Sequence, residues 1–216
     1  MATTEMLRPT EAAVVARVTL RDVNRVIDEH ILPEAFFTLD DGRHVLAAAC
    51  TLISFYFASA RSLTSEQRLF AIREAGSRLH RFRTLDPDAL VNEDWIVRDE
   101  FLTIDLTSFV KRTGERMDRL DAARSLIVID PDVLAGTPVI RGTRIPVYDI
   151  SASVAADIPI DRILAAYPSL DADSIELATL YAEANPPRGR PRTSAEIPTG
   201  AVIIADRGVR RRGKAG

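Results

Sequence analysis

The segment from Val45 to Ala60 most constrains the fold, because it is the longest stretch of the chain without a charged side chain. It is shorter than the ~20 apolar residues that a membrane-spanning helix requires. It also contains hydroxyl side chains at Thr51, Ser54 and Ser59. A helix that is apolar on all sides has to be covered by other parts of the protein. The segment therefore predicts a buried helix in a globular protein rather than a membrane span.

The composition agrees with a globular, cytoplasmic protein. The chain has 216 residues, of which 46% are hydrophobic and 27% are charged, and these values exclude wholesale disorder. Its length allows one large domain or two small ones with a tail. Cys50 is the only cysteine, so no internal disulfide can form. The N-terminus lacks the basic start and apolar run of a secretory signal.

The first part of the chain predicts two short helices followed by a β-hairpin. Thr10 is expected to cap the first helix, Arg17 and Val18 to form a turn, and Thr19 to cap the second helix with Asp22 three residues later. The hairpin is expected at residues 35–46, with its turn at Gly42. In order, these elements resemble a MerR-like winged helix-turn-helix, and this resemblance implies binding to operator DNA.

The second helix is expected to have an apolar stripe made of Leu20, Val23, Ile27 and Ile31. The opposite face carries polar side chains suited to DNA. Arginine can bond guanine edges, asparagine can bond adenine, and neighbouring arginines can bond phosphates. The alternative is an ordinary solvated helix face, and Asp28 on the same face disfavours DNA binding. The residues expected at the DNA interface are Arg17, Arg21, Asn24, Arg25 and Arg43.

The middle of the chain predicts a helix over residues 64–82 whose arginines, including Arg68, lie largely on its outer face. One or two strands are expected over residues 95–106, a helix over 106–123 and a short strand over 126–129.

The segment from Asp130 to Val147 contains the string Gly-Thr-Pro-Val-Ile-Arg-Gly-Thr-Arg-Ile-Pro, and Ala-Ala-Tyr-Pro-Ser-Leu follows at residues 165–170. These motifs closely resemble the bacterial family called domain of unknown function 433, over residues 130–185. Many members of that family carry a glycine where this chain has Asp157. The resemblance implies an antitoxin of a type II toxin–antitoxin pair, similar to VapB, with a PIN-like ribonuclease as the cognate toxin.

Within this module we expect two β-rich triplets and three helices, over residues 148–156, 161–167 and 171–183. The module carries three arginines and nine carboxylates, a net charge of −6, so its last helix is a poor candidate for binding DNA. We expect the module as a whole to mediate dimerisation or partner contact, unless Arg141 and Arg144 contact the DNA backbone. The preferred expectation for these two arginines is an internal ion pair with Asp130, Asp132 or Asp149.

Residues 186–216 form a basic tail with a net charge of +6, whereas the rest of the chain carries −9. Arg-Gly-Arg-Pro-Arg at 188–192 matches an AT-hook core for the minor groove. Given the family resemblance, the preferred target is the carboxylate-lined Mg²⁺ site of the ribonuclease, with a solvated linker as the alternative. The residues expected to bind the toxin are Arg188, Arg190, Arg192, Val202, Ile203, Ile204 and Arg207.

Catalytic motifs are not apparent in the sequence. His30, His44 and His80 lack the spacing of a metal site, and no glycine-rich phosphate loop is present. We therefore expect no enzymatic activity, no cofactor and no metal.

Together these features predict a mainly α fold with small β elements, of the α+β class. The expected divisions are a winged helix-turn-helix-like region at 1–85, a connecting β/α segment at 86–129, the module at 130–185 and an extended tail at 186–216. The leading hypothesis is a dimeric antitoxin that inhibits a PIN-like ribonuclease and represses its own operon. The alternatives are a stand-alone transcriptional regulator with an AT-hook-like tail, and an interaction protein without a DNA role.

Overall fold

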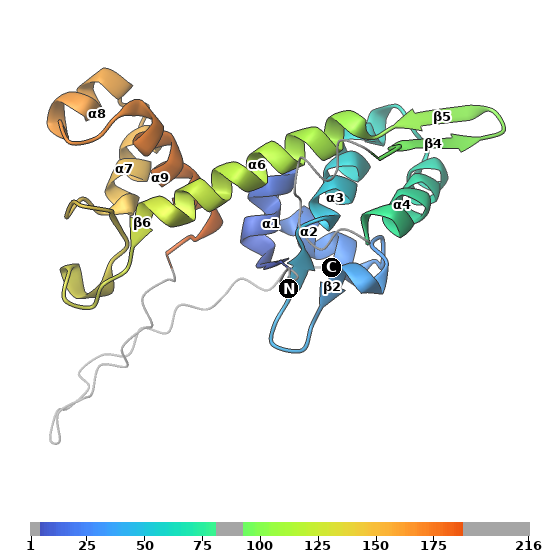
Figure 1. Ribbon diagram of the computed structural model, residues 1–216, viewed down its shortest axis with the longest axis horizontal. Coiled ribbons are helices and arrows are strands. Elements are labelled where there is room, and N and C mark those ends of the chain that lie inside the picture. The colour runs from blue at the N-terminus through green and yellow to red at the C-terminus, as the bar shows by residue number, and fades with distance from the viewer. Residues whose placement is uncertain (1–4, 81–92, 188–216) are drawn as a thin grey trace, which may run out of the picture.

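A computed structural model describes residues 5–80 and 93–187 of the chain. They form a mainly helical structure with small antiparallel sheets, which confirms the predicted α+β class (Figure 1). The helices are α1 (Pro9–Ala16), α2 (Leu20–Asp28), α3 (Ala49–Ala58), α4 (Ser65–Leu79), α6 (Thr107–Leu126), α7 (Val147–Ala155), α8 (Ile160–Ala166) and α9 (Ala172–Ala184). The strands are β1 (Met6–Leu7), β2 (Phe37–Thr38), β3 (His44–Leu46), β4 (Ile96–Asp99), β5 (Leu102–Asp105), β6 (Ile127–Val128) and β7 (Val139–Ile140). Within the described ranges no helix is both long and apolar enough to cross a bilayer.

The N-terminal sheet has the strand order β1-β3-β2, and all its pairs are antiparallel. The predicted hairpin is confirmed: Phe37 lies opposite Val45, and Gly42 takes a φ of 94° in the turn, a conformation that glycine adopts without a steric penalty. The sequence did not reveal β1, whose two residues are too few to show alternation.

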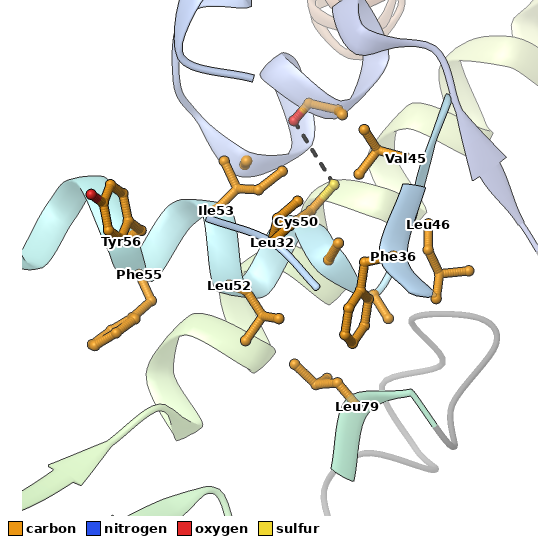
Figure 2. Close-up of a cluster of buried hydrophobic side chains, with 14 of the residues drawn as sticks. Leu32, Phe36, Val45, Leu46, Cys50, Leu52, Ile53, Phe55, Tyr56 and Leu79 are labelled. Carbon is orange, nitrogen blue, oxygen red and sulfur yellow. Dashed lines mark hydrogen bonds between the residues drawn. The ribbon is translucent and has the colours of Figure 1, made fainter. Parts of the chain in front are cut away.

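The helix predicted over residues 45–60 begins later than expected. Val45 and Leu46 belong to β3, and α3 starts at Ala49. Its side chains form much of the N-terminal core together with Phe36 and Leu79, as Figure 2 shows. Cys50 is fully buried there, and this burial raises the pKa of its thiol. Its Sγ lies 3.9 Å from the Ala12 carbonyl oxygen.

Helix α4 starts after Thr64, whose hydroxyl accepts a hydrogen bond from the Gln67 amide. The expectation that Arg68 lies outside is wrong. Its side chain is buried, its Nη1 donates to the Tyr56 carbonyl at 2.9 Å, and its guanidinium lies 4.2 Å from the centre of the Tyr56 ring. A guanidinium tolerates this position because these contacts replace its water.

Strands β4 and β5 form a hairpin that leads directly into α6, the longest of the described helices (Figure 1). The first part of α6 packs in the N-terminal core, and Ala123 near its end packs in a second core that belongs to the C-terminal module. Thr113 on α6 and Thr51 on α3 share a fully buried hydrogen bond of 2.7 Å between their hydroxyl oxygens.

The C-terminal module contains the β6–β7 pair and helices α7 to α9, close to the predicted ranges. Asp171 caps α9 as predicted, by accepting a hydrogen bond from the Ser174 amide at 2.7 Å. Asp157 has a φ of 53°, the left-handed conformation that glycine favours and aspartate tolerates. A glycine at this position would adopt the same turn without a steric penalty.

The module is docked on the N-terminal region by α9, which packs against both α1 and α6. A network of ion pairs supports this contact. The buried carboxylate of Glu11 on α1 binds Arg8 at 2.9 Å and Arg124 on α6 at 3.0 Å, and Arg124 also binds Glu5 at 2.9 Å. Arg8 in turn donates a hydrogen bond to the Asn185 side chain after α9.

These contacts fix the charge states of the network. Burial raises the pKa of Glu11, but hydrogen bonds from Arg8 and Arg124 outweigh burial and hold it below its ordinary value. For Arg124, burial lowers the pKa, but the hydrogen bonds to Glu11 and Glu5 outweigh burial and hold the pKa above its ordinary value. A carboxylate between two guanidiniums satisfies the charge that burial would otherwise leave uncompensated.

Replacement of Glu11 by Gln is expected to lower the free energy of unfolding by about 2 kcal/mol, because it leaves Arg124 partly buried without its main partner. Since the folded pKa of Glu11 is lowered, its contribution is complete above the ordinary glutamate pKa and is lost as the pH falls through the lower folded pKa. Thermal melts should therefore show the variant and wild type converging in acid. Glu29→Gln, which removes an exposed pair, is the control and should cost less than about 1 kcal/mol. An equal loss in both variants would contradict the prediction.

Candidate nucleic-acid interface

Helices α1 and α2 are joined by a three-residue turn, which the local sequence specifies. Arg17 ends α1 in the left-handed conformation with a φ of 59°, as the predicted turn requires. Thr19 begins α2 through the predicted reciprocal cap: its Oγ1 accepts from the Asp22 amide, and the Asp22 carboxylate accepts from the Thr19 amide, both at 3.1 Å. The two helices and their short turn are followed by the β2–β3 hairpin, in the order expected from the sequence.

The first helix differs from prediction at its start. Thr10 does not cap α1, because the helix already begins at Pro9, with Arg8 at the capping position and the Glu11 carboxylate accepting from the Arg8 amide. Proline at the first helical position fits, since its missing N–H would have no partner there.

The exposed face of α2 brings together most of the residues predicted to bind DNA. Arg21 and Arg25 are exposed and Asn24 is half-buried. Arg43 reaches over from the hairpin, where its Nη1 donates to Asn24 Oδ1 at 3.0 Å. Arg17 lies apart from this face, at the start of the turn.

Leu20 was expected on the apolar stripe of α2, but 45% of it is exposed. Val23 and Ile27 of the same stripe are buried as predicted. Leu20 stands at the first position of the helix, where no neighbouring element covers it fully, and it lines two surface grooves.

Acidic side chains form ion pairs with two of the three arginines of this face. Arg25 pairs with Glu29 at 3.0 Å, and this hydrogen bond raises the pKa of Arg25. Arg43 pairs with Asp28 at 2.8 Å. The face is therefore close to neutral, and only Arg21 of its three arginines has no ion pair among the described residues. Binding to DNA would require Arg25 and Arg43 to exchange their carboxylates for phosphates or bases.

A second basic cluster, which the sequence did not suggest, lies beside the turn. A groove of about 840 Å³ separates the turn from α3 and α6, and Arg17, Arg112 and Arg116 line it. Arg116 donates to the Val15 carbonyl at 3.1 Å and Arg112 to the Ser108 carbonyl at 2.9 Å. None of the three pairs with a carboxylate in the part of the chain that the structure describes.

The charges of this cluster act on one another. Burial, followed by the positive charges of Arg17 and Arg112, lowers the pKa of Arg116. The spacing of Arg112 and Arg116, four residues apart on a predicted helix, was the available signal, because residues so spaced share one face. Their proximity to Arg17 depends on the packing of α6 against α1 and could not be deduced from that spacing.

The acidic helix of the module has an internal role. Arg119 on α6 pairs with Asp173 at 2.7 Å and with Glu176 at 3.1 Å, both on α9. The expected ion pair of Arg141 is wrong: its Nε and Nη2 both donate to the Ser125 carbonyl, at 3.0 and 2.8 Å. Arg144 likewise pairs with no carboxylate among the described residues.

No group of three histidine, cysteine, aspartate or glutamate side chains in residues 5–80 and 93–187 is placed to hold a metal ion. The predicted toxin-binding residues lie outside the described part of the chain. They are Arg188, Arg190, Arg192, Val202, Ile203, Ile204 and Arg207.

Comparison with known proteins gives two matches. Residues 127–182 match the family model described as a protein of unknown function, DUF433. The whole chain is 63% identical, over 215 residues, to "Uncharacterized protein y4eO" of Sinorhizobium fredii (strain NBRC 101917 / NGR234), and the match covers 97% of that protein. No solved structure matches the chain significantly.

Replacing Thr19 by Ala should lower the free energy of unfolding by about 1 kcal/mol, because the Asp22 amide at the start of α2 loses its acceptor. The matched control is Thr10→Ala, which changes a residue inside α1 and should alter stability by less than about 0.5 kcal/mol. Urea unfolding followed by circular dichroism measures both. A larger loss for Thr10→Ala would show that Thr10 acts as the cap after all.

Proposed function

We propose, on the premise that the chain belongs to the same family as y4eO and carries a DUF433 segment, that it is a DNA-binding antitoxin. Its helix-turn-helix binds operator DNA through α2, and its basic C-terminal segment inhibits a PIN-like ribonuclease. The observation that best supports the DNA-binding role is the arrangement of α1, α2 and the β2–β3 hairpin, with Arg21, Asn24 and Arg25 on the outer face of α2.

The chemistry of that face suits a duplex. Arg21 and Arg25 lie four residues apart and Asn24 lies between them, so one helix face offers donors to guanine and a bidentate partner to adenine. Arg43 on the hairpin is close enough to α2 to bond Asn24, so it can contact a phosphate beside the same groove. Paired recognition helices would suit a palindromic operator, which favours a homodimer.

The toxin-binding role rests on the family resemblance and on charge. The tail carries a net charge of +6, and arginine bonds carboxylates bidentately, so it suits a nuclease site that gathers carboxylates around Mg²⁺. The described module supports a division of labour, since α9 uses Asp173 and Glu176 to bind Arg119 of its own chain. The acidic module thus serves to hold α6, and the tail is left to reach a partner.

The double variant Arg21→Ala, Arg25→Ala should bind DNA from the promoter region of its own operon at least about tenfold more weakly, because each lost base or phosphate contact costs about 1 kcal/mol or more. Fluorescence anisotropy at several salt concentrations measures the loss and the accompanying decrease in salt dependence. The control is Arg61→Ala, Arg73→Ala, which removes two exposed arginines outside the proposed interface and should leave affinity nearly unchanged. Equal binding by wild type and the α2 variant would place the DNA site elsewhere.

Truncation after Asn185 should abolish inhibition of the PIN-like ribonuclease that the proposal expects to be encoded beside the gene, while DNA binding is largely retained, because the tail is the proposed inhibitory segment. Co-expression followed by a pull-down, together with an RNA cleavage assay, measures the first effect, and anisotropy measures the second. A truncated chain that still inhibits the nuclease would refute the role of the tail. If truncation abolished DNA binding and had no effect on the nuclease, the result would favour a stand-alone regulator whose tail binds DNA.

A further inference from the structure

Phe101 is the most exposed large hydrophobic residue among those the structure describes, with 97% of its surface open to solvent. It lies with Glu100 in the two-residue turn between β4 and β5, and the hairpin extends beyond the helices at one end of the molecule (Figure 1). By contrast, Phe36 and Phe55 are almost completely buried. An aromatic ring in this position loses the free energy that its burial would provide.

The hairpin itself does not require this side chain. Two-residue turns favour glycine, asparagine and aspartate, and phenylalanine offers the turn no conformational advantage. The hairpin is instead fixed at its base, where Trp95, Val97 and Ile104 are buried against the core. A firmly anchored hairpin therefore presents Phe101 at its tip.

The tip is also acidic. Asp99 and Glu100 directly precede Phe101, both are exposed, and neither pairs with an arginine or lysine within residues 5–80 and 93–187. The Asp99 carboxylate accepts only the neighbouring Glu100 amide, at 2.8 Å. The tip thus combines one aromatic ring with two uncompensated negative charges, and it suits a surface that is apolar and basic.

The groove beside the helix-turn-helix is such a surface. Apolar side chains line it, among them Leu20, Phe57 and Phe109, together with the three arginines that lack carboxylate partners. Arg112 lies 4.9 Å from the Phe109 ring, so cationic and aromatic groups are already adjacent there. Two carboxylates also line the groove: Asp22, which binds the Thr19 cap, and Glu183.

We propose that the tip formed by Asp99, Glu100 and Phe101 docks in this groove of a second copy of the chain. Phe101 packs against the apolar lining, and the two tip carboxylates pair with Arg17, Arg112 or Arg116. The hairpin extends away from the N-terminal end of α6 (Figure 1), whereas Phe109, Arg112 and Arg116 within that helix line the groove, so the tip is directed away from the groove of its own chain.

The positions of tip and groove suit a closed dimer. Both lie on or near the N-terminal half of α6, so a two-fold axis near that end of the helix sets each tip opposite the partner's groove. Such an exchange is isologous and stops at two copies. The lining of the groove does not include Arg21, Asn24 or Arg25, and the proposal does not depend on whether the chain binds DNA.

The first experiment measures the mass of the full-length protein by light scattering after size-exclusion chromatography at micromolar concentration. Wild type should be a dimer, and Phe101→Ser should elute at half that mass. The control is Leu39→Ser, which removes an exposed apolar side chain beside the other hairpin turn and should remain dimeric. A monomeric wild type, or a Phe101→Ser variant that stays dimeric, would overturn the proposal.

The second experiment exchanges charges between the two surfaces. A tip variant carries Asp99→Arg and Glu100→Arg, and a groove variant carries Arg17→Glu and Arg112→Glu; circular dichroism checks that each is folded. Each variant alone should be monomeric, because both of its contacts become repulsive. A mixture of the two should form heterodimers, since one contact is then wild type and the other has both charges reversed.

Failure of the mixture to dimerise would overturn the proposal even if each variant alone is monomeric. A groove variant that stays dimeric but loses DNA affinity would also overturn it, because the arginines would then be phosphate contacts. Loss of DNA binding by the α2 variant with an intact dimer concerns only the proposed function.

Discussion

The carboxylate of Glu11 lies where the two modules of this chain meet, between the guanidiniums of Arg8 and Arg124. A buried carboxylate is costly unless its charge is matched, and here two guanidiniums match it, so a displacement that separated Glu11 from both would leave its charge uncompensated. The network therefore favours one relative position of α1, α6 and the end of α9 over others. Because α2 follows α1 after a three-residue turn, the orientation of both helices relative to the C-terminal module depends on the same contacts.

The basic residues of the molecule divide into those that acidic neighbours neutralise and those that they do not. Arg25 and Arg43 on the α2 face are paired, as is Arg119 on α6. The arginines of the groove pair with no carboxylate among the described residues, and burial, followed by the positive charges of Arg17 and Arg112, lowers the pKa of Arg116. Because the paired arginines must give up a partner to bind an anion, charge alone favours the groove as the first place where an acidic group binds.

Local sequence predicted local structure well. The reciprocal cap of Thr19 and Asp22, the Gly42 turn and the Asp171 cap each involve residues at most three or four positions apart, so their geometry follows from spacing. The predicted start of α3 was wrong because apolar residues such as Val45 and Leu46 fit a strand as well as a helix. These two residues form a strand because β3 pairs with β1 and β2.

Long-range contacts were beyond the reach of the sequence. Helical spacing predicted that Arg68 is exposed, but its side chain is buried and donates a hydrogen bond to the carbonyl of Tyr56 on another helix. The Glu11–Arg124 pair joins residues over a hundred positions apart, and the groove depends on the packing of α6. For the candidate site, spacing predicted the α2 arginines and Asn24, whereas the arginines of α6 became apparent only once the fold was known.

The hydrogen bond between Thr51 and Thr113 has a consequence for motion between the modules. Both hydroxyls are sealed from water, but Thr113 also donates to the Phe109 carbonyl of its own helix and keeps that bond if α6 moves. A shift of α6 along its axis would therefore leave the Thr51 hydroxyl without its partner, at a cost of about 1–3 kcal/mol. Piston-like sliding of α6 is thereby opposed. Any change in the relative position of the two modules would therefore tilt or twist this helix about a fixed pivot rather than slide it.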